Sequence, residues 1–202
     1  MRIGSLAKKL RQAMPAVTAI ILVTIATGCS AGCSASVSVG HEKTGGTYRG
    51  HGVSFKIPDG WKRLTDLTTR ASAGNESWSE GFAPRSGSDL VGITAYATKL
   101  AITDGNAGGY APDVTAAINN LLAPTGGSVV SGPTLISISG MAGYRFETAF
   151  NSKSGAKLES RMLLVWNGHT EYFLNCQSLA RSSDKAEVER GCTTIVDSFK
   201  LI

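Results

Sequence analysis

The sequence predicts an α+β fold, with one antiparallel β-sheet of about six strands and helices packed on it. Two observations support this prediction. Most of the chain after residue 48 consists of short segments in which apolar and polar residues alternate, which is the pattern of half-buried strands. Two longer segments, one near the middle and one near the end, carry apolar residues at helical spacing. Strands with separate helices are typical of the α+β class.

The first half of the folded region is expected to hold three strands and a helix. Val53–Ile57 alternates apolar with polar residues, and further strands are expected at 77–83 and 91–97. The glycine-rich residues 104–110 are expected to form a mobile loop. Pro112 is expected in the first turn of a helix, where its missing N–H has no cost. The apolar stripe of this helix is Val114, Ile118, Leu121 and Leu122.

The second half is richer in strands. The extended segment 129–138 contains Gly132-Pro133 and is expected at a sheet edge, because proline cannot donate to a neighbouring strand. Asn167-Gly168 is a strong hairpin signal, since both residues tolerate a positive φ. Three more strands are expected, at 144–150, 157–166 and 170–177.

A helix and a short strand are expected to close the chain. The helix is expected to begin near Asp184, with Glu187 forming an approximate capping box, and the strand covers 198–202. Gly191 lies inside this helix, where glycine costs about 1 kcal/mol relative to alanine. Its missing side chain would allow a close approach to the sheet. The apolar positions of the helix are Val188, Cys192, Ile195 and Val196.

Residues 1–28 have the three parts of a bacterial export signal. A basic segment ends near Arg11, an apolar segment runs from Ala16 to about Ile25, and small residues precede Cys29. The apolar segment is too short for a transmembrane helix, which needs about 20 apolar residues.

A cysteine at this junction resembles the lipobox of bacterial lipoproteins. The resemblance implies cleavage before Cys29, a diacylglycerol on its thiol and acyl chains such as palmitate that hold the chain at the outer face of the cell membrane. The lipobox usually has leucine where this chain has Ala26, and Cys33 is a second candidate. Secretion without a lipid is the alternative. Residues 29–46 are expected to be a flexible tether, and 47–202 one folded domain.

The net charge of +5 comes mostly from the leader. The chain has 20 basic and 15 acidic residues, a balance that would suggest a nucleic-acid partner. Four of the basic residues and none of the acidic ones lie in 1–28, so residues 29–202 carry 16 basic residues against 15 acidic ones, a net charge of +1. The exported part therefore gives no electrostatic reason to expect nucleic acid as a partner.

Cys176 and Cys192 are expected to form a disulfide, because exported proteins fold in an oxidising environment. The bridge would join the closing helix to a strand. Two free thiols and a metal pair are the alternatives, and a metal site would need further ligands at a recognisable spacing, which the sequence does not show.

Three segments resemble PsbP-like domains: Tyr48–Trp61, which ends in Pro-Asp-Gly-Trp, then Ser139–Arg145, and finally Ile195–Lys200. The resemblance covers about 48–202 and implies an antiparallel sheet between helical layers. Among lipid-anchored proteins, the chain is similar to actinobacterial lipoproteins of the LpqN type. The ion-handling residues of the plant PsbP proteins cannot be placed on this chain, and a shared fold does not carry their function across.

The sequence contains no recognised catalytic, metal-binding or nucleotide-binding motif. His51 and His169 are each able to bind metal or act as a base, but turn histidines are more often solvated, and His41 has no second ligand nearby. We therefore expect no catalytic residue, no metal and no cofactor. The tryptophans are expected to fill the core or its rim, and they are Trp61, Trp78 and Trp166.

These features predict a non-enzymatic accessory or binding protein at the outer face of the cell membrane, with an envelope protein, a lipid or a glycan as its partner. One alternative is an envelope hydrolase or transferase with dispersed site residues, and another is a carrier with an apolar cavity for a small ligand. Converging polar groups with shifted pKa values would favour an enzyme, whereas a flat apolar patch would favour a binding protein.

Overall fold

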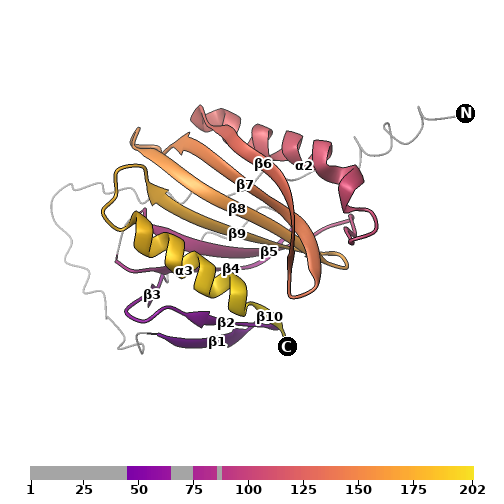
Figure 1. The fold of residues 1–202 in the computed structure, drawn as a ribbon, viewed down its shortest axis with the longest axis horizontal. Helices are drawn as coiled ribbons and strands as arrows, with labels where there is room; N and C mark the ends of the chain where they lie inside the picture. Colours follow the sequence, from indigo (N-terminus) through magenta and orange to yellow (C-terminus); the bar gives the residue numbers. More distant parts are fainter. Residues whose placement is uncertain (1–44, 65–74, 86–87) are drawn as a thin grey trace, which may run out of the picture.

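The computed structural model describes residues 45–64, 75–85 and 88–202. These residues form the predicted α+β fold, with two α-helices and ten strands (Figure 1). The strands are arranged in two antiparallel sheets, whereas the sequence predicts one. The strand β1 (Gly46–Gly50) forms the first hairpin with the predicted strand at 53–57, whereas β3 (Lys62–Arg63) was not predicted.

The larger sheet has seven strands, and every neighbouring pair is antiparallel. β6 lies at an edge, as Gly132-Pro133 predicts, and Asn167-Gly168 lies at the predicted hairpin between β8 and β9. In spatial order the strands are β3, β4 (Glu76–Ala83), β5 (Leu90–Ala97), β9 (Thr170–Leu179), β8 (Lys157–Asn167), β7 (Met141–Asn151) and β6 (Ser128–Ile138).

The smaller sheet has the order β1, β2 (Val53–Ile57) and β10 (Lys200–Leu201). It lies beside α3 in Figure 1. Phe55 of β2 contacts Phe82 of the larger sheet edge-on, with ring centroids 5.4 Å apart, and stacks on Phe199 at 6.0 Å. The first hairpin therefore packs its apolar face on the larger sheet and does not extend the edge of that sheet. This packing explains why the structure has two sheets where the sequence predicts one.

The helices α2 (Ala107–Leu122) and α3 (Lys185–Ser198) pack on opposite faces of the larger sheet. Successive residues of a strand point to opposite faces, so the central strand β8 supplies side chains to both cores. Leu163 lies in the core with α3 and the smaller sheet, whereas Leu164 lies in the core with α2. We call these the α3 face and the α2 face.

Helix α2 begins before the position that the sequence predicts. A loop is expected at 104–110 and Pro112 in the first turn, but the helix starts at Ala107 and places Pro112 in its second turn. The side chain of Asn106 closes the preceding turn through two hydrogen bonds to the backbone. The buried hydroxyl of Tyr144 donates to the carbonyl of Ala107. These contacts hold the glycine-rich segment as helix despite its low helix propensity.

Helix α3 begins directly after Asp184, as predicted, but without the expected capping box. The side chain of Asp184 makes no capping hydrogen bond, and its Oδ1 instead lies 3.4 Å from Nη1 of Arg85.

Candidate functional site

The predicted disulfide between Cys176 and Cys192 is present and joins β9 to α3. Cys29, the predicted lipidation site, lies outside the described residues, as do Cys33 and His41. Neither helix in the described part of the chain is long and apolar enough to cross a membrane. Nor does the described part hold three His, Cys, Asp or Glu side chains grouped as a metal site requires.

The tryptophans lie in the core or at its rim, as predicted. Trp61 and Trp166 are buried, and Trp78 is partly buried against the core of the α3 face. His169 is exposed in the turn between β8 and β9, as a solvated turn residue would be.

His51 lies beside a buried carboxylate that sequence reasoning did not single out. Its ring stacks on Trp78 with centroids 5.0 Å apart, and its Nε2 is 3.7 Å from Oε1 of Glu80. Glu80 is 1% exposed and accepts hydrogen bonds from Nε and Nη2 of Arg63, at 2.6 and 2.5 Å. The hydroxyl of Tyr48 donates to the same carboxylate at 3.0 Å. Burial and this hydrogen bond raise the pKa of Tyr48. Protein donors thus engage Glu80, and the cluster ties the first hairpin to β4.

Two hollows of about 220 and 130 Å³ flank α3 on the α3 face. Charged side chains of β7, β8 and α3 line them, and most of these charges pair with one another. Nε of Arg161 donates to Glu147 at 3.0 Å, and Nζ of Lys185 donates to Glu159 at 2.5 Å. Because the partners of these ion pairs lie within the protein, the hollows are weaker candidates for a site than the group described next.

A third group of polar residues lies on the α2 face. Glu76, Tyr96, Glu171 and Trp166 are successive cross-strand partners on β4, β5, β9 and β8. Directly opposed residues of antiparallel strands share a face. Tyr96 and Trp166 belong to the core under α2, which places all four on that face. We call these four residues the acidic–aromatic row.

Glu76 reaches this face because β4 contains a β-bulge. Glu76 pairs with Tyr96 and Trp78 pairs with Ala95, so Ser77 is one extra residue in β4. In a regular strand, residues two apart share a face. Here Trp78 packs against the α3 core, whereas Glu76 lies beside Tyr96. No sequence pattern revealed this bulge, so the row could not be found from the sequence.

The row carries shifted pKa values. Burial raises the pKa of Glu171 to about 7 and also raises the pKa of Glu76. Burial, followed by the negative charges of Glu76 and Glu171, raises the pKa of Tyr96. None of the hydrogen bonds or ion pairs of the described residues involves either carboxylate. Two desolvated carboxylates therefore lie around one tyrosine without a counter-ion from the described chain.

Two buried polar atoms of the row have no hydrogen-bond partner among the described residues, and they are Oε1 of Glu76 and Nε1 of Trp166. Trp166 is only 4% exposed. A buried polar atom without a partner costs about 1–3 kcal/mol. Orphaned polar atoms beside groups with shifted pKa values are typical of a site that a ligand completes.

The α2 face is covered unevenly by the described residues. α2 contacts β6 and β7, at the far side of the sheet from β4 and β5. At Gly92 of β5, which shares the face with Tyr96, a Cβ atom would meet only Cδ1 of Leu90 within 4 Å among described residues, at 3.8 Å. Close by, the hydroxyls of Ser79 and Thr94 hydrogen-bond to each other at 2.9 Å. The row thus adjoins a polar part of the sheet over which few described residues lie.

No protein-family model matches the chain, and no curated protein matches it. Solved structures do match its fold. Cyanobacterial PsbP (CyanoP) from Synechocystis sp. PCC 6803 has a TM-score of 0.55 at 14% identity, over 86% of this chain and 98% of that one. The chain has a PsbP-like fold. This finding confirms the fold that the resemblance of the segments beginning at Tyr48, Ser139 and Ile195 implies.

Two further structures are similar to this PsbP-like chain at lower scores. LpqN of Mycobacterium tuberculosis, a protein involved in cell envelope biogenesis, has a TM-score of 0.49 at 12% identity, over 80% of this chain and 87% of that one. A protein from Bacteroides thetaiotaomicron has a TM-score of 0.46 at 12% identity, over 80% of this chain, and the chain spans 49% of its length. At such identities, the likeness concerns the fold and carries no function.

Proposed function

We propose that this chain is a non-enzymatic binding protein, lipid-anchored at the outer face of the cell membrane, that engages an envelope ligand or partner through the acidic–aromatic row. The main support is the presence of two buried atoms without a hydrogen-bond partner among the described residues, Oε1 of Glu76 and Nε1 of Trp166, beside two carboxylates that no described residue neutralises. A protein that only had to fold would gain by pairing or replacing these groups. A bound ligand would supply the missing partners.

Export and anchoring rest on other features. The Cys176–Cys192 disulfide supports an oxidising location outside the cytoplasm. The export signal at 1–28 and the cysteine that follows it support a lipid on Cys29. The small, polar residues 30–46 would then separate the domain from the membrane surface.

The anchor is tested by mass spectrometry of protein extracted from membranes. We expect a mature chain that begins at Cys29 and carries a diacylglycerol, and we expect Cys29→Ser to release the protein into the medium. An unmodified mature wild-type protein in the medium would contradict the anchor, and a lipid on Cys33 would move it to the second candidate.

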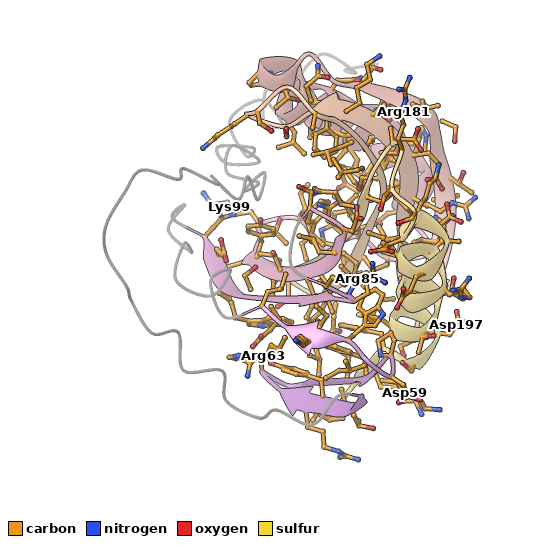
Figure 2. All side chains as sticks on the ribbon, turned by 90° about the vertical axis from the view of Figure 1, so that its left-hand side faces the viewer. Asp59, Arg63, Arg85, Lys99, Arg181 and Asp197 are labelled. Atoms are coloured by element: carbon orange, nitrogen blue, oxygen red, sulfur yellow. A yellow bond between two sulfur atoms is a disulfide. The ribbon has the colours of Figure 1, made fainter. Side chains whose placement is uncertain are left out.

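Binding through the row is tested by site-specific photocrosslinking in intact cells. Lys99 is exposed three residues beyond Tyr96, and Asp197 is exposed on α3, on the other side of the molecule in Figure 2. With a photoreactive amino acid at position 99, we expect a discrete crosslinked product that Glu171→Gln diminishes. Position 197 is the matched control and should lack this product. No product at position 99, or the same product at both positions, would contradict binding at the row.

One observation favours a second function, an envelope hydrolase or transferase. A carboxyl group whose pKa is about 7 is suited to general acid–base catalysis at neutral pH, and Glu171 is such a group. The two functions differ in what happens to the captured ligand. A binding protein would release it unchanged, whereas an enzyme would convert it, and Glu171→Gln would then bind the ligand without converting it.

A further inference from the structure

The acidic–aromatic row spans four neighbouring strands with a definite order of chemical groups. Glu76 and Glu171 lie on either side of Tyr96, and Trp166 follows Glu171. Neighbouring strands are about 4.8 Å apart, so the backbones of the two glutamates are about 10 Å apart and the whole row extends over about 14 Å. This length suits a ligand of two small rings better than a single ion.

The two carboxylates of the row favour a positively charged ligand. An anionic ligand would add a third negative charge beside the carboxylates of Glu76 and Glu171. A neutral ligand would leave both carboxylates without a counter-charge beyond what the described residues supply, which is none, in a desolvated place where ionisation is already unfavourable. Ammonium groups would neutralise the carboxylates, donate to the orphaned Oε1 of Glu76 and lie favourably against an aromatic face.

The indole of Trp166 adds a second requirement. Its Nε1–H is a donor without an acceptor among the described residues, and an ammonium group has no lone pair to offer it. The ligand must therefore also carry an acceptor such as a hydroxyl oxygen. An apolar ring face would pack on Tyr96, between the two carboxylates. Ammonium groups, hydroxyls and a ring face occur together in amino sugars.

We propose that the acidic–aromatic row binds an amino sugar with free amines, about two rings long, with its ammonium groups at Glu76 and Glu171 and a hydroxyl accepting from Trp166. This ligand class rests on the binding function proposed above. Uncharged or N-acylated sugars lack the ammonium groups and are expected to bind poorly.

The test compares four ligands by calorimetry on the full-length, detergent-solubilised protein. They are the β-1,4-linked disaccharide of glucosamine, its N,N′-diacetyl form, cellobiose and cadaverine. We expect the glucosamine disaccharide to bind at least tenfold more tightly than each of the other three. Equal affinity for the diacetyl form or cellobiose would overturn the role of charge. Equal affinity for cadaverine would overturn the role of the hydroxyls, and no binding of the disaccharide would overturn the proposal as a whole.

Two variants and one spectroscopic signal locate the site. Glu171→Gln is expected to weaken disaccharide binding at least tenfold, whereas Glu189→Gln, an exposed carboxylate on α3, should leave it unchanged. The indole N–H resonance of Trp166, assigned with Trp166→Phe, is expected to shift at saturation. Equal affinity in Glu171→Gln and wild type, or an unmoved Trp166 resonance, would overturn binding at the row. A crosslink at Lys99 in cells combined with no sugar binding would refute the ligand class and leave the binding function standing.

Discussion

The ring of Trp61 packs directly on the backbone of Gly191. A Cβ atom at position 191 would lie 2.1 Å from Cζ2 and 2.3 Å from Cη2 of that ring, far inside van der Waals contact. Trp61 is 2% exposed, and it follows the Pro-Asp-Gly turn after β2. The missing side chain of Gly191 thus allows a close approach, but the partner is this tryptophan and not the sheet that the sequence predicts.

Gly191→Ala is expected to lower the free energy of unfolding by about 1–3 kcal/mol, because a methyl group would force Trp61 or α3 to move. Urea unfolding with the disulfide intact measures the change. Gly108→Ala in α2 is the matched control, since no described atom lies within 4 Å of its Cβ position, and it should be neutral or stabilise by up to about 1 kcal/mol. Similar effects of the two substitutions would contradict the packing argument.

Reduction of the Cys176–Cys192 disulfide is expected to lower the free energy of unfolding by about 3 kcal/mol, because the bridge closes a loop across a separation of 16 residues. The measurement compares urea unfolding with and without a reducing agent. The double variant Cys176→Ala/Cys192→Ala should be destabilised by a similar amount and be insensitive to the reductant. An unchanged midpoint, with reduction verified by mass, would show that the helix is held without the bridge.

The free energy of unfolding is expected to fall as the pH rises, because Glu171 becomes ionised in a buried place. Burial raises its pKa from 4.5 to about 7 in the folded state, so the folded protein holds the proton more tightly than the unfolded chain. The resulting stabilisation is complete below about pH 4.5 and is lost as the pH rises through about 7, a change of at most about 3 kcal/mol. Glu171→Gln removes the ionisation and should be more stable than the wild type at pH 8. Urea unfolding of both proteins from pH 4.5 to 8 measures the difference, and parallel pH profiles would contradict the prediction.

Glu80→Gln is expected to lower the free energy of unfolding by about 1–3 kcal/mol, because a neutral amide replaces the buried carboxylate that Arg63 and Tyr48 contact. Hydrogen exchange should also speed up in β1, which carries Tyr48. Glu159→Gln is the control, since its ion pair with Lys185 is partly exposed and such pairs contribute about 0–1 kcal/mol. Equal losses in the two variants would show that the buried cluster has no special role in stability.

Local patterns were sufficient to predict most of the larger sheet. Alternation located strands such as 157–166 because consecutive side chains of a strand point to opposite faces, and Gly132-Pro133 identified the edge because proline lacks an N–H. The predicted start of α2 was wrong because contacts of Tyr144 and Asn106 outweigh the low helix propensity of the glycines in the first turn.

The candidate site could not be predicted from such local patterns. Glu171 falls within the predicted strand 170–177 and faces Trp166 across the predicted hairpin, but its pairing with Tyr96 depends on strand register between distant segments. The cluster around Glu80 likewise joins Tyr48 and Arg63 through tertiary packing. A single sequence shows which residue types are present, but it does not show which of them face one another across a sheet.

The extra residue Ser77 affects how the sequences of relatives should be aligned with this protein. A relative with the same number of residues but no bulge could retain its strands, its core and its disulfide, yet its glutamate would share the face of Trp78, on the other side of the sheet. A relative lacking the extra residue would instead keep its glutamate opposite the tyrosine in a regular strand. At 14% identity to the CyanoP structure, overall similarity does not separate the two cases. A one-residue gap at this position is therefore compatible with the row, and the strand pairing of the glutamate is what separates relatives that have the row from those that share only the fold.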